Sequence, residues 1–252
     1  MIPFQDAKSI VKSHLFRLGS ESVLLAESSG RILAEDITAS MSSPQFDNSA
    51  MDGFAVRALD TIGATKENPI SLKMVSVSAA GTPSNVEIGT GECAQCMTGA
   101  TIPNGTDAIV MVEDSSGFSD ADTIQIMIEA FSGKHIRKLG EEIKKGEILI
   151  PKGIRITPSE IGTCATFGYG NIKVSKKPKI AIFGTGNELI EPGNKLEEGQ
   201  IYNSNLYVFA ELAEKAGSEI VMRDVIKDDK ESLRQFLFEA LESCDVIISS
   251  GG

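Results

Sequence analysis

Acidic side chains lie among turn-forming residues in one short stretch, 46–55, whose sequence is FDNSAMDGFA. Neither the alternation of a strand nor the spacing of a helix fits it, and Asn-Ser and Asp-Gly are typical of turns. Phe46 and Phe54 flank the stretch, which favours an irregular loop anchored to a core, a usual place for chemistry. Asp47 and Asp52 are its candidate functional acids. The alternative is an ordinary turn in which these carboxylates cap backbone N–H groups.

Two further polar stretches could join such a site. Thr98 and the glycine after it follow a predicted strand directly, as either a plain turn or a second polar loop. Residues 134–142, KHIRKLGEE, place three cations before two acids, the second of which is Glu142. A run of this kind is by default a solvated surface. Its functional alternative is an anion-binding loop beside a metal-facing carboxylate.

The elements that would position a ligand are clearest after residue 179. Buried strands are expected at 180–183, 219–225 and 245–249, because short apolar runs are bounded there by turn residues. Helices are expected at 203–216 and after Asp229, which can cap the second helix. This βαβαβ order predicts a parallel sheet with right-handed crossovers.

Ligands of open parallel sheets bind beyond the carboxyl ends of the strands. Three loops reach that edge, namely 184–189 (GTGNEL), 226–229 (IKDD) and 249–252 (SSGG). Glu188 and Asp228 supply carboxylates there. Because acids that face an anionic ligand need a bridging cation, we predict a divalent metal, for which Mg²⁺ is the usual choice. The alternative for Glu188 is a solvated acid, and for Asp228 a helix cap.

A dinucleotide-binding interpretation of this edge fails. After Gly184 and Gly186, the third glycine of the G-x-G-x-x-G fingerprint would fall at Leu189, and loop residues 190–199 follow instead of a helix. The sequence contains no Walker motif either. A nucleotide-dependent oxidoreductase is therefore the weaker class, and tight binding of NAD(H) would be needed to revive it.

The chain before residue 179 has a different pattern. An amphipathic helix is expected at 4–18, stopped by Gly19, and a second helix at 157–167, begun by a capping box of Thr157 and Glu160. Short alternating runs separated by turns, from 70 to 128, predict a β-rich module, and further short strands are expected on either side of it. The expected strands are 23–26, 37–39, 70–77, 92–97, 108–112, 123–128, 147–150 and 154–156. The lysines around Pro178 indicate a linker.

Composition excludes several classes of protein. The chain has 252 residues, a net charge of −11 and 41% hydrophobic residues. This acidity argues against nucleic acid or an anionic membrane as the main partner. No apolar run approaches the ~18 residues of a membrane helix and no secretory signal is visible, which favours the cytoplasm. Cys93 and Cys96 form a lone C-x-x-C without the second pair or nearby histidines of a structural zinc site, so the cysteines are expected to be free thiols. They are Cys93, Cys96, Cys164 and Cys244.

Several of these stretches, taken together and in this order, resemble one family, the molybdopterin molybdenumtransferases of the MoeA type, which are related to the gephyrin E domain. The matching stretches are 47–55, 97–100 with Pro103 and Gly105, 136–141, 184–189, 199–205 (GQIYNSN) and 249–252. The resemblance implies insertion of molybdate into adenylylated molybdopterin, with release of AMP and the help of a divalent metal, usually Mg²⁺. The alternative is a fragment that binds the pterin as a scaffold without turnover.

The resemblance also implies site residues. It places Asp52, Thr98, Glu188 and Asp228 in catalytic positions, and it assigns Glu142, Glu188 and Asp228 to the metal. The pterin-binding residues that it implies are Gly184, Thr185, Gly186, Asn205, Ser249, Ser250 and Gly251. In this family the site is shared across a homodimer, where the β-rich module of one subunit faces the α/β domain of the other. The protein that adenylylates molybdopterin is a candidate partner.

The predicted fold is a multi-domain α/β protein. Residues 1–43 and 145–176 are expected to form a discontinuous, elongated N-terminal domain. Residues 44–144 are expected to form the inserted β-rich domain. Residues 177–252 are expected to form an incomplete α/β domain with a parallel sheet, similar to molybdopterin-binding domains.

The chain departs from the family pattern at three places. Glu142 stands where the family usually has aspartate, so the carboxylate is kept but reaches further. Asn187 stands where an aspartate often precedes the glutamate, which removes one candidate metal ligand. The family continues past Gly252 with Val-Ser-x-Gly and further domains, which predicts that this chain is truncated.

Overall fold

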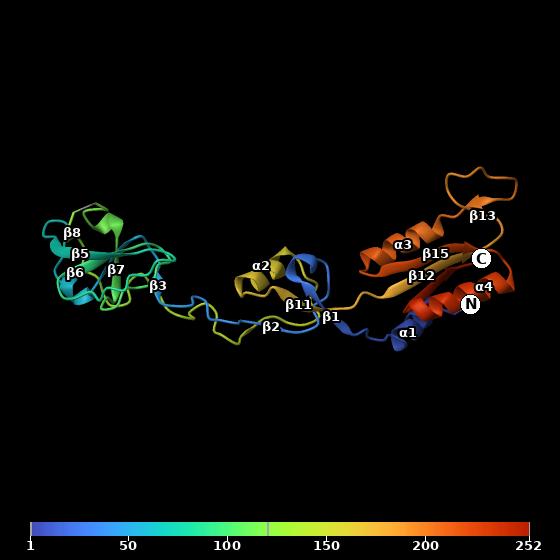
Figure 1. The fold of residues 1–252 in the computed structure, drawn as a ribbon, viewed down its shortest axis with the longest axis horizontal. Helices are drawn as coiled ribbons and strands as arrows, with labels where there is room; N and C mark the ends of the chain where they lie inside the picture. Colours follow the sequence, from blue (N-terminus) through green and yellow to red (C-terminus); the bar gives the residue numbers. More distant parts are fainter. Residues whose placement is uncertain (1, 120, 252) are drawn as a thin grey trace. The chain divides into compact units, whose positions relative to one another are not determined.

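A computed structural model describes residues 2–119 and 121–251, so Gly252 of the predicted loop 249–252 lies outside the described residues. The chain divides into two compact units (Figure 1). The first unit consists of Met1–Ile37 and Ile150–Gly252, and the second of Thr38–Leu149. The predicted inserted domain, 44–144, falls within the second unit. The predicted boundary at residue 177 stays a prediction, because this division leaves both of its sides in the first unit.

A five-stranded mixed sheet forms the second unit, in the order β7-β4-β6-β5-β8. Its strands are β4 (Gly53–Val56), β5 (Ile70–Ser78), β6 (Glu92–Cys96), β7 (Ala108–Met111) and β8 (Thr123–Ile126). The pair β5 and β6 is parallel and the other neighbours are antiparallel. The four predicted strands from 70 to 128 are confirmed. Two 3₁₀ turns, η2 (Ala58–Thr61) and η3 (Val112–Asp114), follow β4 and β7.

The two cysteines of β6 face opposite sides of this sheet. Cys93 packs with Phe54 and Leu72 in one core, and Cys96 packs with Ala55 and Ile109 in another. Residues three apart in a strand point to opposite faces, so these two thiols cannot approach each other. Burial raises the pKa of Cys93 to about 12 and that of Cys96 to about 11. The prediction of free thiols is confirmed for all the cysteines of the chain.

The stretch 46–55 is more regular than the sequence indicates. It contains β3 (Asn48–Ser49), which pairs with β9 (Ile136–Arg137), and it enters β4 at Gly53. The prediction of a wholly irregular loop is therefore wrong. A two-residue strand is too short to show a period, and β4 is buried on both faces, which removes alternation. A short turn of Ala50–Asp52 remains between the strands.

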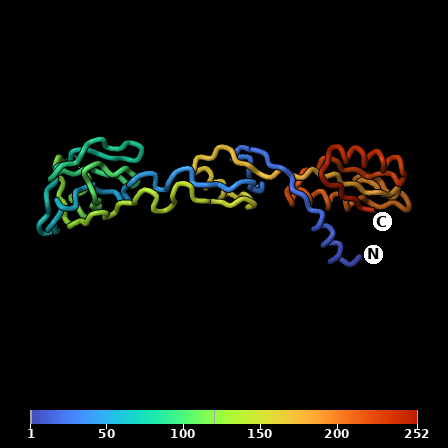
Figure 2. Tube along the Cα trace, turned by 90° about the horizontal axis from the view of Figure 1, so that it is seen from below, coloured from blue at the N-terminus to red at the C-terminus, as the bar shows by residue number. Residues whose placement is uncertain are grey.

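Two connecting segments, 38–47 and 138–149, run side by side where the chain enters and leaves the second unit (Figure 2). Ala39 N donates to Glu147 O at 2.8 Å, and Gly146 N donates to Ala39 O at 2.8 Å. Further along, Ser43 N donates to Ile143 O at 2.8 Å. The chain thus enters and leaves the second unit through a paired ribbon. The predicted N-terminal domain of 1–43 and 145–176 stays a prediction.

The earlier part of the first unit is built from short elements. They are α1 (Phe4–Ser13), β1 (Ser20–Leu24), η1 (Leu25–Glu27), α2 (Pro158–Thr166) and β11 (Asn171–Ser175). Two further strands, β2 (Ile37–Thr38) and β10 (Ile148–Ile150), each include residues of both units. Strand β1 pairs antiparallel with β11, and β2 lies beside β10. The capping box of Thr157 and Glu160 at the start of α2 is confirmed.

Three predictions for this part need correction. Helix α1 ends at Ser13 and not at 18, and none of its residues is buried. The predicted strand 154–156 is only an isolated bridge between Arg155 and Ile32. The predicted linker around Pro178 is shorter than expected, because Lys173 lies in strand β11, whose alternate residues Ile172 and Val174 are buried, whereas Lys176 and Lys177 lie in the irregular segment between β11 and β12 (Lys179–Thr185). Lys173 between them is exposed, and its place among the lysines near Pro178 concealed the strand pattern.

The later part of the first unit is a three-layer α/β arrangement (Figure 1). Its elements are β12 (Lys179–Thr185), β13 (Leu189–Ile190), β14 (Ile201–Tyr202), α3 (Asn205–Lys215), β15 (Glu219–Ile226), α4 (Lys230–Ser243) and β16 (Val246–Ser250). The main sheet has the order β15-β12-β16, and both pairs are parallel. The predicted βαβαβ sheet is therefore confirmed, and Asp229 caps α4 as predicted.

The two helices cover opposite faces of this sheet. Ile180 and Ile182 of β12 pack against α3, whereas Ala181 and Phe183 pack against α4. Burying both faces of the central strand explains its continuous apolar run. Among the described residues, no helix has the length and apolar character needed to cross a bilayer.

Candidate functional site

The loops after β12 and β15 meet at the carboxyl edge of the sheet, as predicted. Gly186 N donates to Ile226 O at 3.4 Å, and Asp228 N donates to the side-chain oxygen of Asn187 at 3.3 Å. Asn187 therefore ties the loop that carries Glu188 to the loop that carries Asp228. An amide at this position keeps the two carboxylates on the same edge without adding a third charge.

A cavity of about 230 Å³ opens at this edge. Its lining residues are Gly184, Thr185, Glu188, Leu189, Ile201, Tyr202, Asn203, Ser204, Asn205, Ser250 and Gly251. Hydroxyl and amide groups dominate its polar lining, and Asn205 Nδ2 donates to Ser250 Oγ at 3.0 Å. Such groups can donate to phosphate or pterin oxygens.

The predicted pterin-binding residues divide into two groups. The residues that line the cavity are Gly184, Thr185, Asn205, Ser250 and Gly251. Gly186 and Ser249 are not among the lining residues, and neither is Asp228. Asn203 and Ser204 also line it, although the sequence indicated them only within the matching stretch 199–205 and not as site residues. Their signal was available, because a crossover helix starts at the carboxyl edge and therefore brings the residues around its first turn to the ligand.

The carboxylate of Glu188 lies directly over the backbone of Gly186. A methyl group added at Gly186 would lie 2.6 Å from Oε1 and 2.7 Å from Oε2 of Glu188. Gly186 also has a φ of +153°, which side-chain-bearing residues rarely adopt. The glycine therefore makes room for the position that the Glu188 carboxylate occupies.

In the second unit, Asp52 and Thr98 are joined directly. Oδ1 of Asp52 accepts from Thr98 N at 2.7 Å and from Thr98 Oγ1 at 2.7 Å. The backbone bond, followed by the hydroxyl bond, holds the pKa of Asp52 below its ordinary value of 3.8. Among the described residues Oδ2 has no such partner, and both side chains belong to exposed residues. The pair presents an ionised carboxylate to solvent.

We expect T98A to raise the pKa of Asp52 toward 3.8, because one of its two hydrogen-bond donors is removed. The pKa should stay below that value, since the backbone N–H of residue 98 remains. NMR titration of the side-chain carboxyl carbon measures the change. T98S keeps a hydroxyl and serves as the control. An identical Asp52 pKa in T98A and the parent protein would show that the hydroxyl does not bond the carboxylate in solution.

Asp47 behaves as the alternative interpretation predicted. It accepts from Lys138 Nζ at 2.8 Å and from Leu139 N at 2.8 Å, and these bonds lower its pKa. Arg137 Nε donates to Asn48 Oδ1 at 2.9 Å. These two cations of the basic run are therefore paired with the stretch 46–55. Asp52 also accepts from a backbone N–H, so both acids have the structural role of bonding backbone N–H groups. Asp52 nevertheless stays exposed to solvent.

The predicted metal ligands come from different units. Glu142 belongs to the second unit, where its Oε2 accepts from Ser43 Oγ at 3.1 Å. Glu188 and Asp228 belong to the first. Within 2–119 and 121–251, no group of three or more His, Cys, Asp or Glu side chains is placed to hold a metal ion. Mg²⁺ binds through one or two carboxylates together with water and substrate phosphate, so Glu188 and Asp228 suffice as protein donors. The metal assignment stays a prediction.

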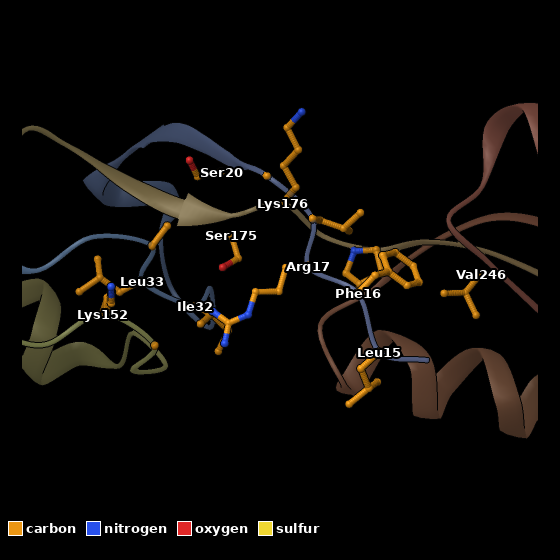
Figure 3. A pocket seen from close by; sticks show the side chains of 15 residues that line it. Leu15, Phe16, Arg17, Ser20, Ile32, Leu33, Lys152, Ser175, Lys176 and Val246 are labelled. Carbon is orange, nitrogen blue, oxygen red and sulfur yellow. The ribbon is translucent and has the colours of Figure 1, made fainter. Parts of the chain in front are cut away.

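A larger cavity, about 800 Å³, lies elsewhere in the first unit (Figure 3). Its lining residues are Leu15, Phe16, Arg17, Leu18, Gly19, Ser20, Ile32, Leu33, Ala34, Lys152, Gly153, Ser175, Lys176, Pro178 and Val246. They include no carboxylate and none of the predicted site residues. The smaller cavity is the candidate site because donors from three loops and Glu188 converge there.

Comparison with known proteins matches two families, one after the other along the chain. The family described as MoeA N-terminal region (domain I and II) matches residues 2–168. The family described as a probable molybdopterin binding domain matches residues 181–252. Two solved molybdopterin biosynthesis MoeA proteins from Pyrococcus horikoshii have TM-scores of 0.89 and 0.87 at 36% and 33% identity. These matches cover 100% and 99% of this chain, and 64% and 66% of those chains.

Curated relatives agree with the structural neighbours. A protein of Staphylococcus aureus strain Mu50, named molybdopterin molybdenumtransferase, is 40% identical over 252 residues. A protein of the same name from Bacillus subtilis strain 168 is 39% identical over 254 residues. Each match covers 100% of this chain and 59% of the relative, so the chain spans well under two thirds of their length. With both regions matched in order and the MoeA N-terminal region matched over 2–168, the chain belongs to the MoeA family.

Proposed function

We propose that this protein acts in molybdenum cofactor biosynthesis, as a transferase that inserts molybdate into adenylylated molybdopterin and releases AMP. The observation that carries the proposal is the cavity at the carboxyl edge of the sheet. Its hydroxyl and amide donors suit an anionic, phosphorylated ligand, and Glu188 lies in its wall. The names of the curated relatives support the same reaction.

We propose Mg²⁺ as the metal of this reaction, held by Glu188 and Asp228. Both are hard oxygen donors on loops that one hydrogen bond ties together. When bound, the ion would neutralise negative charge on phosphate oxygens. The chain's own residues bind and orient the ligand: Thr185, Asn205 and Ser250 offer donors around the cavity.

We also propose that the site is shared between two copies of the chain. Asp52 and Thr98 belong to the second unit, whereas Glu188 and Asp228 belong to the first. Helix α1 supports a second copy as partner, because its apolar residues, including Phe4, are exposed and none of its residues is buried. A mixture of one variant lacking Asp52 and another lacking Glu188 should regain activity that neither shows alone. No regained activity would place each site within one chain.

The central test is a paired binding and turnover measurement on the intact protein. We expect adenylylated molybdopterin to bind and, with molybdate and Mg²⁺, to release AMP. E188A and D228A should each lower molybdenum insertion at least tenfold, because each removes a carboxylate from the ligand edge. Unchanged insertion in both variants would refute the site assignment. Binding without AMP release would support the alternative, a scaffold that holds the pterin.

We expect G186A to impair this reaction through Glu188 alone. The added methyl group would displace the carboxylate, and a displacement of about 1 Å at a site can cost tenfold or more in rate. The matched control is G193A, because Gly193 also has a positive φ, +99°, but nothing lies within 4 Å of its added carbon. The measurement is molybdenum insertion by both variants. A G186A rate equal to that of G193A would show that displacing the Glu188 carboxylate does not impair the reaction.

A further inference from the structure

We propose that Glu191 is a positioning residue for the cavity at the carboxyl edge, acting through Asn203. The proposal rests on the function proposed above, since it concerns how the same cavity is held in shape. Glu191 itself does not line the cavity. It follows β13 directly, whereas Asn203 lies two residues before the start of α3 and lines the cavity.

Both carboxylate oxygens of Glu191 accept a hydrogen bond from the α3 side. Oε1 accepts from Asn203 Nδ2 at 2.8 Å, and Oε2 accepts from Tyr207 OH at 2.8 Å. One donor lies two residues before α3 and the other lies in its first turn. One carboxylate therefore connects the end of β13 to two points near the start of the helix.

Asn203 passes this restraint on to the cavity wall. It is only 3% exposed, and its backbone N donates to Ile190 O at 2.9 Å. Its Oδ1 accepts from Leu206 N at 3.4 Å, one of the N–H groups that a helix start leaves without a helical partner. Its amide group is thus held at both ends. Loss of the Glu191 carboxylate would free Nδ2 and let the side chain rotate.

The next residues along the chain form the wall itself. Ser204 and Asn205 follow Asn203 and line the cavity, and Asn205 bonds Ser250 on the neighbouring loop. A rotation at Asn203 would therefore shift two further lining residues. Displacements of about 1 Å are enough to weaken a ligand's hydrogen bonds severely.

The charge of Glu191 suits this role. The hydrogen bonds from Asn203 and then from Tyr207 hold the pKa of Glu191 below its ordinary value of 4.5, so it is an anion at neutral pH. An ionised carboxylate accepts hydrogen bonds at both oxygens and carries no proton of its own, so Glu191 can accept from both donors at once. The guanidinium of Arg223 lies over the Tyr207 ring, 4.5 Å from its centre, and this cation–π contact also restrains the ring.

The test uses the intact protein, adenylylated molybdopterin as ligand, and the variants E191A, E191Q and E198A. Glu198 is an exposed acid of the same loop and gives the matched control. We expect E191A to raise Kd and KM about tenfold with kcat within about twofold, because the cavity loosens while the reacting groups remain. E191Q should recover most of the affinity, since its amide oxygen can still accept from Asn203. E198A should match the parent protein.

The outcomes separate this inference from the proposed function. If the parent protein binds the ligand and E191A binds it equally well, the positioning role is overturned while the proposed function stands. The same holds if E191Q is as impaired as E191A, or if E191A lowers kcat and leaves KM unchanged. If the parent protein neither binds nor converts adenylylated molybdopterin, the proposed function fails, and the positioning role for that ligand fails with it.

Discussion

Replacing Asp52 by asparagine should lower molybdenum insertion about a hundredfold while leaving the thermal unfolding midpoint nearly unchanged. The asparagine oxygen can still accept from Thr98 N and Thr98 Oγ1, the two bonds that Asp52 Oδ1 makes. The substitution therefore removes the negative charge and keeps the shape of the turn. Because Thr98 keeps the carboxyl ionised, the charge is present at any pH at which the reaction would be assayed.

The control for D52N is E67Q, which neutralises an exposed acid elsewhere in the second unit. Measuring molybdenum insertion and thermal unfolding for both variants separates a local effect from a change in net charge. A D52N variant with the parent's turnover would return Asp52 to the role of a turn-capping residue. A large fall in the unfolding midpoint would show that its charge supports the fold, contrary to its exposure.

The α/β part of the fold was predictable because its signals are local. The strand at Ile180 reads as a short apolar run, the helix ending before Gly217 carries apolar residues on one face, and Asp229 caps the next helix. Each signal lies within one element and agrees with its neighbours. The order of elements then determines a parallel sheet and, with it, the edge at which Glu188 and Asp228 lie.

The elements that were missed depend on contacts between distant residues. Strand β3 is only two residues long and exists because Asn48 and Ser49 pair with Arg137 and Ile136.

The length of helix α1 was a different error. It was predicted too long because apolar spacing continues to Leu18, although the helix ends at Ser13. The spacing of apolar residues does not predict where a helix ends and the chain turns into the next element.

In the candidate site, too, some residues could be predicted from local sequence signals and others could not. Thr185 and Ser250 could be placed by the rule that ligands bind at the carboxyl edge. The network of Glu191, Asn203 and Tyr207 could not, because it joins residues up to 16 positions apart through their side chains. No residue type in that loop stands out, and only the hydrogen bonds assign it a role.

Replacing Gly53 by alanine should destabilise the second unit by about 3 kcal/mol, at the upper end for overpacked cores. An added methyl carbon would lie 2.0 Å from Val110 O and 2.9 Å from Met111 Cα. Both are backbone atoms of the paired strand β7, so no side-chain rotation can relieve the overlap. Strand β4 lies between β6 and β7, and moving it would disturb the packing of Phe54 and its neighbours.

The matched control is G63A in the same unit. Gly63 has a φ of +83°, so alanine is strained there by about 1 kcal/mol, but nothing lies within 4 Å of the added carbon. Denaturant unfolding of both variants measures the difference, and equal stabilities would show that β4 shifts freely. Gly53 also pairs with Cys96 of β6, two residues before Thr98, so the position of β4 in the sheet determines where Asp52 lies. If β4 is displaced in G53A, the pKa of Asp52 should therefore rise as its bonds to Thr98 lengthen.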